Sequence, residues 1–231
     1  MRPLSLMVPA RAGLLGGVAG LSIIACSTSR PAGRSESPAE RSPEGAIPAP
    51  RGHAFRKAIY RKVGVVNSAD QAAAVRTIRG WSWVDSTRIG VWGWSGGGTM
   101  TLNLMFRYPE IYRTGMAVAS MAELRLYDTI YQERYMGLPQ ENEAAYHDGS
   151  PLFFADRLRG NLLVVHGSGD DNVHFQGTER LINALVAANR PFTLMMYTNR
   201  THCICEGDGT GLHLYSLLTR YLEQNLPAGG R

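Results

Sequence analysis

A serine between glycines is the strongest candidate for a reactive group in this sequence. The segment GWSGG (residues 93–97) fits the pattern G-x-S-x-G and lies between an apolar run typical of a buried strand and a segment typical of a helix. A sharp turn there lifts a serine hydroxyl above the sheet, and glycines avoid Cβ clashes. We expect Ser95 to be a nucleophile and the Gly96 N–H to bind an oxyanion. The alternative is a structural turn serine.

A nucleophilic serine needs a base, and the base needs an orienting acid. In serine hydrolases built on a parallel sheet, the acid and then the histidine follow the serine, each on a loop after a strand. Asp170 follows an apolar run ending at His166, and His202 follows the next such run. Both would lie at the carboxyl edge of the sheet, where open α/β sheets bind ligands. We expect Asp170 to orient His202, although spacing alone does not separate Asp170 from Asp171.

The other five histidines suit the role of base less well. His166 and His174 flank the acid loop and are expected to hydrogen-bond its backbone rather than to catalyse. His53 and His147 lie in polar loop contexts and are expected to be solvated. His213 lies in the last predicted helix, where a structural role is expected.

Two cysteines follow the candidate base closely. Cys203 and Cys205, together with His202 and His213, lack the usual spacing of structural zinc sites. In an extended chain the two cysteine side chains would point apart, so we expect no disulfide between them. Two reduced, buried cysteines are the expectation, and neither a metal nor another cofactor is expected.

Apolar runs and helix-forming segments alternate through the chain. Strands are predicted at residues 88–94, 115–119, 161–166 and 192–197, and helices at residues 67–78, 99–108, 178–189 and 212–226. Continuous apolar runs are typical of strands buried on both faces. The alternation predicts an α/β class, with a parallel sheet, right-handed crossovers and helices on both faces.

Composition fits one globular domain with a tail. The 231 residues are 44% hydrophobic and 19% charged, which is ordinary for a chain that builds a core. The net charge is +5, but the basic residues are scattered, so no nucleic-acid partner is expected. The sequence shows no repeat at a fixed period, so neither a solenoid nor a propeller is expected among these residues.

The first residues are typical of an export signal. Arg2 and Arg11 precede an apolar run at residues 12–25, which is too short to span a bilayer comfortably. The run ends in IIAC (residues 23–26), which resembles the lipobox of bacterial lipoproteins. That resemblance implies cleavage of residues 1–25 and lipidation of Cys26, with Ser27 favouring the outer membrane. The expected location is the bacterial periplasm or outer membrane; the alternative is an uncleaved leader with an incidental cysteine.

A polar segment separates this leader from the predicted domain. Residues 26–50 are rich in Pro, Ser, Gly, Arg and Glu and bury too little apolar surface to order a backbone. We expect a disordered tether there and a globular part at residues 51–231.

Four longer segments resemble one enzyme family. They read GWSGGG (93–98), LYDTIYQERYMGLP (126–139), HGSGDDNVHFQG (166–177) and YTNRTH (197–202), with a weaker match at RKAIYRKVG (56–64). Across most of residues 51–226 the chain resembles the prolyl oligopeptidase family of serine peptidases, in its dipeptidyl peptidase IV branch. The resemblance implies an α/β-hydrolase fold, with Asp170 as acid and His202 as base. It also implies a pocket for the residue before the scissile bond, formed by Tyr127, Tyr131, Asn172 and Val173; core packing is the alternative for the tyrosines.

The sequence also departs from that family. Cys203 stands where members usually have a small residue, and Gly96 where an aromatic often follows the nucleophile. The family's N-terminal propeller, which holds the substrate's amino terminus, and the first strands of the hydrolase sheet have no counterpart here. We therefore expect a partial domain with weak activity. One edge of the strand at residues 88–94 is expected to be open and able to pair with a second copy of the chain.

The resemblance implies hydrolysis of peptide bonds through an acyl-serine intermediate. The implied substrates are short peptides cleaved after proline or alanine, as N-terminal dipeptides. One alternative is a carboxylesterase, which the same three residues could support. The other is a non-catalytic lipoprotein fragment. The expected partners are a peptide substrate and, through Cys26, a membrane.

Overall fold

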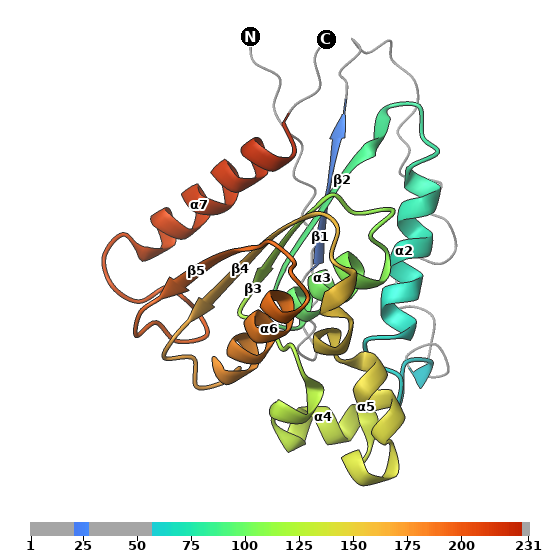
Figure 1. Cartoon of the computed structure of the whole chain (residues 1–231), viewed down its shortest axis with the longest axis vertical. Coiled ribbons are helices and arrows are strands. Elements are labelled where there is room, and N and C mark those ends of the chain that lie inside the picture. Colours follow the sequence, from blue (N-terminus) through green and yellow to red (C-terminus); the bar gives the residue numbers. More distant parts are fainter. Residues whose placement is uncertain (1–20, 28–56, 228–231) are drawn as a thin grey trace.

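A five-stranded sheet forms the centre of the protein (Figure 1). The computed structural model describes residues 21–27 and 57–227, and in this part the strand order is β1-β2-β3-β4-β5. Four strands run parallel: β2 (Val84–Trp94), β3 (Thr114–Val118), β4 (Asn161–Gly167) and β5 (Thr193–Tyr197). Each overlaps its predicted range, and the predicted α/β class is confirmed.

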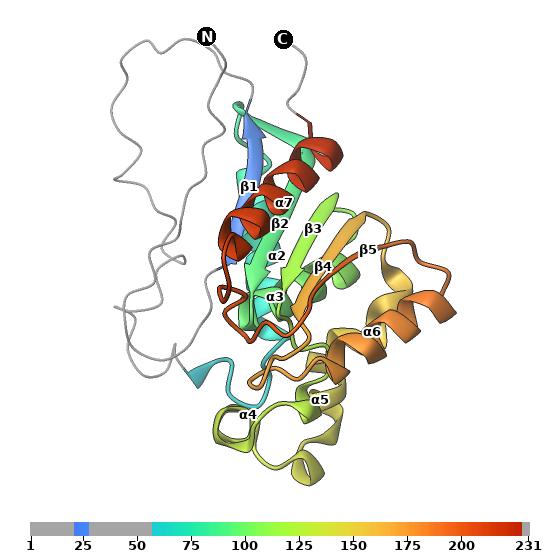
Figure 2. The ribbon, with the colours of Figure 1, turned by 90° about the vertical axis from the view of Figure 1, so that its left-hand side faces the viewer.

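Helices cover both faces of this sheet. They are α2 (Val66–Ile78), α3 (Gly96–Arg107), α6 (Gln176–Ala187) and α7 (Thr210–Asn225). The parallel strands follow one another in sequence order, so right-handed crossovers place α3 and α6 on the same face. Helix α7 follows the last strand and returns across the opposite face (Figures 1 and 2). No helix in the described part of the chain is long and apolar enough to cross a bilayer.

Alternate residues of the central strands pack into two separate cores. In β4, Leu162 and Val164 belong to the core that includes α3 and α6. Leu163 and Val165 belong to the core beneath α7. Because both faces of the strand are covered, it reads as a continuous apolar run rather than an alternating one.

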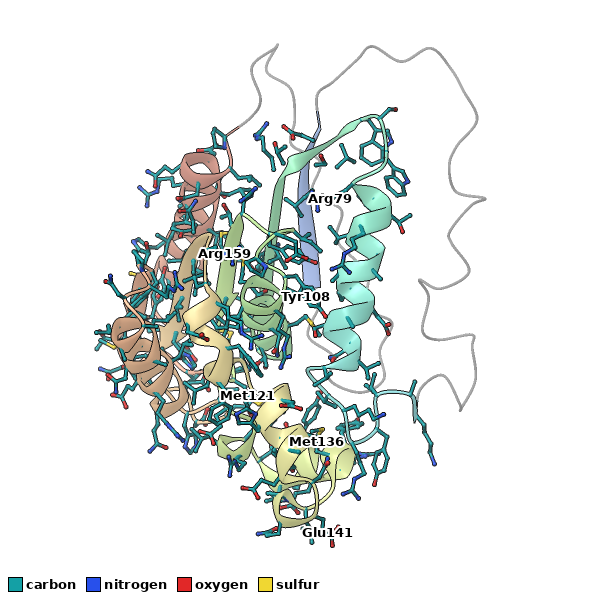
Figure 3. All side chains as sticks on the ribbon, turned by 45° about the vertical axis from the view of Figure 1, so that its right-hand side comes forward. Arg79, Tyr108, Met121, Met136, Glu141 and Arg159 are labelled. Atoms are coloured by element: carbon teal, nitrogen blue, oxygen red, sulfur yellow. A yellow bond between two sulfur atoms is a disulfide. The ribbon has the colours of Figure 1, made fainter. Side chains whose placement is uncertain are left out.

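A small helical unit lies between β3 and β4. It contains η3 (Leu124–Leu126), α4 (Thr129–Met136), η4 (Pro139–Glu141), α5 (Glu143–Gly149) and η5 (Pro151–Arg157). Leu124, Met136 and Tyr146 form its own buried cluster, and Met136 is labelled there in Figure 3. The Asp128 carboxylate caps α4 by accepting from the Tyr131 N–H at 2.7 Å. This cap fixes the first turn of α4.

The structure corrects the expectation of an open edge beside β2. β1 (Leu21–Ser27) pairs antiparallel with β2, from Leu21 opposite Gly93 to Ser27 opposite Val84. The N–H and C=O groups of an unpaired edge are a template for any extended segment, and here a segment of the same chain takes that place. Cys26 therefore lies within a strand. The rest of the predicted leader (1–20) and tether (28–50) lies outside the described residues.

Candidate active site

Ser95 occupies a tight turn between β2 and α3. Its backbone has φ 56° and ψ −121°, a conformation that strains a non-glycine residue by about 1–3 kcal/mol. The Ser95 N–H donates to the carbonyl of Val118 in β3 at 2.8 Å. A Cβ at Gly93 would overlap the backbone of Gly97, and one at Gly98 would lie 2.6 Å from the Val118 oxygen. The turn therefore requires glycine at both positions.

Gly96 begins α3 directly after this serine. The N–H groups of a first helical turn have no partner within the helix, and the helix dipole adds partial positive charge there. A Cβ at Gly96 would meet no heavy atom within 4 Å. Gly96 is only partly buried, and the first-turn N–H groups beside Ser95 suit this helix start to receive a negatively charged oxygen.

Asp170 accepts four hydrogen bonds in the turn after β4. Its Oδ1 accepts from the N–H groups of Asn172 at 3.0 Å and Val173 at 2.8 Å. Its Oδ2 lies 2.8 Å from His202 Nδ1 and 3.1 Å from His166 Nε2. The side chain is fully buried, so these contacts fix its orientation.

The same contacts keep Asp170 ionised. Burial raises the pKa of its carboxyl group, but hydrogen bonds from His166, His202 and the Val173 N–H outweigh burial and hold this pKa well below its usual range. Asp171, in contrast, is exposed. The structure thus distinguishes two carboxylates that spacing alone leaves equivalent: Asp170 contacts His202, and Asp171 faces solvent.

His202 lies on the loop that follows β5. Its side chain is 22% exposed, and because Nδ1 faces Asp170, the other ring nitrogen is free for proton transfer. Trp94, the residue before Ser95, donates from Nε1 to the His202 carbonyl at 3.0 Å. Within the described residues the Ser95 hydroxyl makes no hydrogen bond to His202, and such bonds are often longer without substrate.

The four expected pocket residues lie together beside the acid loop. Tyr127 OH donates to Asn172 Oδ1 at 3.0 Å, and the rings of Tyr127 and Tyr131 meet edge to face at 5.6 Å. Val173 is buried, whereas both tyrosines are only partly buried. Burial raises the pKa of both tyrosines, so their hydroxyls stay protonated at neutral pH. Partial exposure argues against core packing as their role.

Apart from His166 and His202, no histidine in the described residues hydrogen-bonds to the residues of this cluster. His213 Nδ1 lies 2.8 Å from the Tyr197 hydroxyl, which ties α7 to β5. His147 is 49% exposed and His174 is exposed; His53 lies outside the described residues.

His166 contributes more than its sequence context indicates. It contacts the loop backbone, as expected, through the Val173 carbonyl. It also contacts the Asp170 carboxylate itself, which we did not predict. The signal in the sequence is the spacing His-x-x-x-Asp at the end of a strand, and that spacing alone does not specify a contact.

The expectation for the two cysteines is wrong. Cys203 and Cys205 form a disulfide with their Cα atoms 5.1 Å apart, and both are exposed rather than buried. The chain is not extended here, because Ile204 has φ 45° and its N–H donates to the Thr201 carbonyl at 3.1 Å. This turn brings the two side chains together directly after His202. The described part of the chain holds no cluster of three or more His, Cys, Asp or Glu side chains able to bind a metal ion.

Known proteins with similar sequences are peptidases. Prolyl endopeptidase FAP of Mus musculus is 37% identical over 177 residues, which cover 75% of this chain and 23% of that protein. Dipeptidyl peptidase 4 of Felis catus is 34% identical over 177 residues, which cover 75% of this chain and 23% of that protein. The chain thus spans about a quarter of the length of these relatives.

A solved structure and a family-wide comparison agree with these relatives. The crystal structure of Porphyromonas gingivalis dipeptidyl peptidase 4 superposes with a TM-score of 0.74 at 45% identity, over 76% of this chain and 25% of that one. Residues 44–228 match the sequence model of the Prolyl oligopeptidase family. With that match over most of its length, the chain belongs to the prolyl oligopeptidase family.

Proposed function

We propose that this chain is the catalytic part of a serine peptidase, with Ser95 as nucleophile, His202 as base and Asp170 as orienting acid. The observation that carries the proposal is the 2.8 Å contact between Asp170 Oδ2 and His202 Nδ1. This contact lies at the edge of the sheet where Ser95 occupies its strained turn. The 3.0 Å bond from Trp94 to the His202 carbonyl ties the two loops together.

The chemistry follows from the roles of these groups. His202 takes the hydroxyl proton of Ser95 as Oγ bonds to the substrate carbonyl carbon, and the Gly96 N–H stabilises the oxyanion. The C–N bond then breaks as His202 returns the proton to the leaving amine. Water, deprotonated in turn by His202, hydrolyses the acyl-serine and regenerates Ser95. Asp170 holds the imidazole throughout.

The proposed substrates are short peptides cleaved after proline or alanine, as N-terminal dipeptides. The pocket of Tyr127, Tyr131, Asn172 and Val173 favours a small, apolar residue before the scissile bond. The pyrrolidine ring of proline would pack against the tyrosine rings. The names of the relatives, a prolyl endopeptidase and a dipeptidyl peptidase, support the same class.

Covalent labelling tests the nucleophile directly. The purified chain should react with a fluorescent alkyl fluorophosphonate, and Ser95→Ala should abolish the labelling. Ser95 is only partly buried and its hydroxyl contributes little packing, so the melting temperature should change little. Labelling of the alanine variant at the rate of the unmodified chain would contradict the assignment.

Turnover tests the substrate class. Gly-Pro and Ala-Pro anilides should be cleaved in preference to p-nitrophenyl esters of comparable size once leaving-group reactivity is corrected with hydroxide rates. Preference for the esters, with Ser95 still labelled, would indicate a carboxylesterase on the same three residues.

We further propose that the chain is exported to the bacterial periplasm or outer membrane and anchored through a lipid on Cys26. The support is the sequence: Arg2 and Arg11, an apolar run, and IIAC at residues 23–26. Residues 26–50 would then tether the domain at residues 51–231. Intact-mass analysis should find a lipidated Cys26 at the mature terminus, and Cys26→Ser should remain unprocessed. A mature terminus elsewhere would exclude this anchor.

A second copy of the chain is the proposed partner after such processing. Cleavage before Cys26 removes residues 21–25, which pair with residues 89–93 of β2. The vacated edge could then pair with another chain. Light scattering should find residues 26–231 self-associated and residues 1–231 less so; monomers in both samples would refute this.

A further inference from the structure

His166 is a buried side chain with three polar contacts. It lies near the end of β4, with its side chain fully buried. Its Nε2 is 3.1 Å from Asp170 Oδ2 and 2.9 Å from the Val173 carbonyl oxygen. Its Nδ1 is 2.7 Å from the Thr178 hydroxyl at the start of α6. Every polar atom of the ring is thus engaged.

These partners determine where the ring carries its proton. The Val173 carbonyl and the ionised Asp170 carboxylate are acceptors only. Nε2 must therefore carry the hydrogen and share it between them. In the neutral ring Nδ1 is then the acceptor, and the Thr178 hydroxyl donates to it. One tautomer of His166 satisfies all three contacts.

Asp170 Oδ2 receives this hydrogen bond beside the one from His202. The other oxygen, Oδ1, is held by the N–H groups of Asn172 and Val173. Rotation of the carboxylate about its Cβ–Cγ bond would move both oxygens, so the donors on Oδ1 and those on Oδ2 fix its angle together. On the Oδ2 side His166 opposes this rotation, because it is itself fixed between β4 and α6.

We propose that His166 is a positioning residue of the candidate active site: its Nε2–H fixes Asp170 Oδ2 in the place where that oxygen receives His202 Nδ1–H. This role rests on the proposed function, in which Asp170 orients the base. His166 does not touch the reacting atoms. It acts on His202 through the carboxylate that both rings share, and it also holds the Val173 end of the acid loop.

Two substitutions separate the two sides of the ring. His166→Gln places an amide N–H near the position of Nε2 and keeps the bond to Asp170. His166→Asn places an amide oxygen near Nδ1, keeps the bond from Thr178 and loses the bond to Asp170. A third variant, Thr178→Val, removes only the hydroxyl contact. All three lose part of the same buried network, so melting temperatures report its structural contribution.

The labelling rate of each variant should depend on whether it keeps the hydrogen bond to Asp170, and not on its melting temperature. With the fluorophosphonate probe and the full chain, His166→Asn should react about tenfold more slowly or worse, as expected for a lost hydrogen bond to a charged group. His166→Gln and Thr178→Val should stay within about threefold of the unmodified chain. Equal slowing of the Gln and Asn variants, or no slowing of either, would overturn the proposal.

A spectroscopic signature tests positioning without any activity. In 15N-histidine-labelled chain, His166 should show a protonated Nε2 and an unprotonated Nδ1; the opposite tautomer would overturn the proposal even if no variant folded. The His202 Nδ1–H signal should persist in His166→Gln and exchange with water in His166→Asn. If the unmodified chain shows both signals yet no probe labels Ser95, the proposed function fails while the positioning role stands.

Discussion

Replacing Asp170 by asparagine places an amide where four N–H donors converge. Each carboxylate oxygen accepts two of them: Oδ1 accepts from the backbone of Asn172 and Val173, and Oδ2 from His166 and His202. An amide has one oxygen, so its NH2 group must face one pair of donors. The backbone N–H groups cannot change, whereas the rings can move their protons. The amide nitrogen should therefore turn toward the two histidines.

The cost of this change can be estimated from the contacts that are lost. Two hydrogen bonds to a charged group disappear, each worth about 1.5–3 kcal/mol. Weaker bonds from the amide N–H groups offset part of this loss, and His166 loses its bond to the Val173 carbonyl when its proton moves, so the total should be about 3–5 kcal/mol. His202 would also keep its proton on the nitrogen facing Ser95. It then cannot accept the hydroxyl proton, so labelling should slow about 10⁴-fold, the loss seen for this change in another triad.

Thermal unfolding and fluorophosphonate labelling measure the two effects on the same samples. A loss of 3–5 kcal/mol should lower the melting temperature by roughly 10 °C in a domain of this size. Asp171→Asn is the matched control, since this neighbouring carboxylate is exposed and should change stability by less than about 0.5 kcal/mol. Equal losses in the two variants would refute the assignment of the orienting role to Asp170.

Three further outcomes follow from the same geometry. Gly93→Ala should lower the free energy of unfolding by about 3 kcal/mol or more, because the new Cβ would overlap the backbone of Gly97. Gly96→Ala should cost less than about 1 kcal/mol. Similar melting temperatures for the two variants would contradict the turn geometry. Reducing the Cys203–Cys205 disulfide with dithiothreitol should slow labelling about fivefold, because it lets the turn that follows His202 relax ~1 kcal/mol or more of backbone strain. The Cys203→Ser variant should label at the same rate with and without the reductant. If its rate changes, the reductant acts on another group. The lowered pKa of Asp170 contributes stability that is fully present above the pKa of the unfolded chain, about 3.9, and is lost as the pH falls toward the pKa of the folded chain. The difference in unfolding free energy between the unmodified chain and Asp170→Asn should therefore narrow below about pH 4. A difference that stays constant with pH would exclude this linkage.

The parallel strands could be predicted because each carries its own signal. β4 is apolar on both faces, one packed on α3 and α6 and the other under α7, so its run of apolar residues is continuous. β2 was predicted to start at residue 88, but it starts at Val84. Residues 85–87 are polar, and Val84 pairs with Ser27, a residue far away in the sequence. A local pattern cannot indicate pairing with a distant segment.

The disulfide shows a different limit of sequence reasoning. A β-branched residue disfavours the left-handed conformation, so Ile204 argues for an extended chain and for divergent cysteines. The structure holds Ile204 at φ 45° and buries its side chain in the core under α7. Burial of the Ile204 side chain and the disulfide together hold the backbone between Cys203 and Cys205. The contact of His166 with Asp170 has the same origin, because it depends on how β4 leads into the following turn.

The pairing of β1 bears on the predicted lipid anchor. Leu21 to Ala25 lie opposite Gly93 to Ile89, and beyond Cys26 one further pair joins Ser27 to Val84. Cleavage between Ala25 and Cys26 would remove every pair except that last one. One remaining backbone pair, between Ser27 and Val84, does not offset the conformational entropy that is lost when the residues around it are ordered. The same residues can therefore serve as a cleaved leader or as the edge strand beside Ser95, but not as both in one mature chain. In an unprocessed chain the β2 edge is covered up to Gly93, two residues before the candidate nucleophile. In a lipidated chain the same edge offers its N–H and C=O groups to a partner strand, so processing at Cys26 would decide what supports the nucleophile turn.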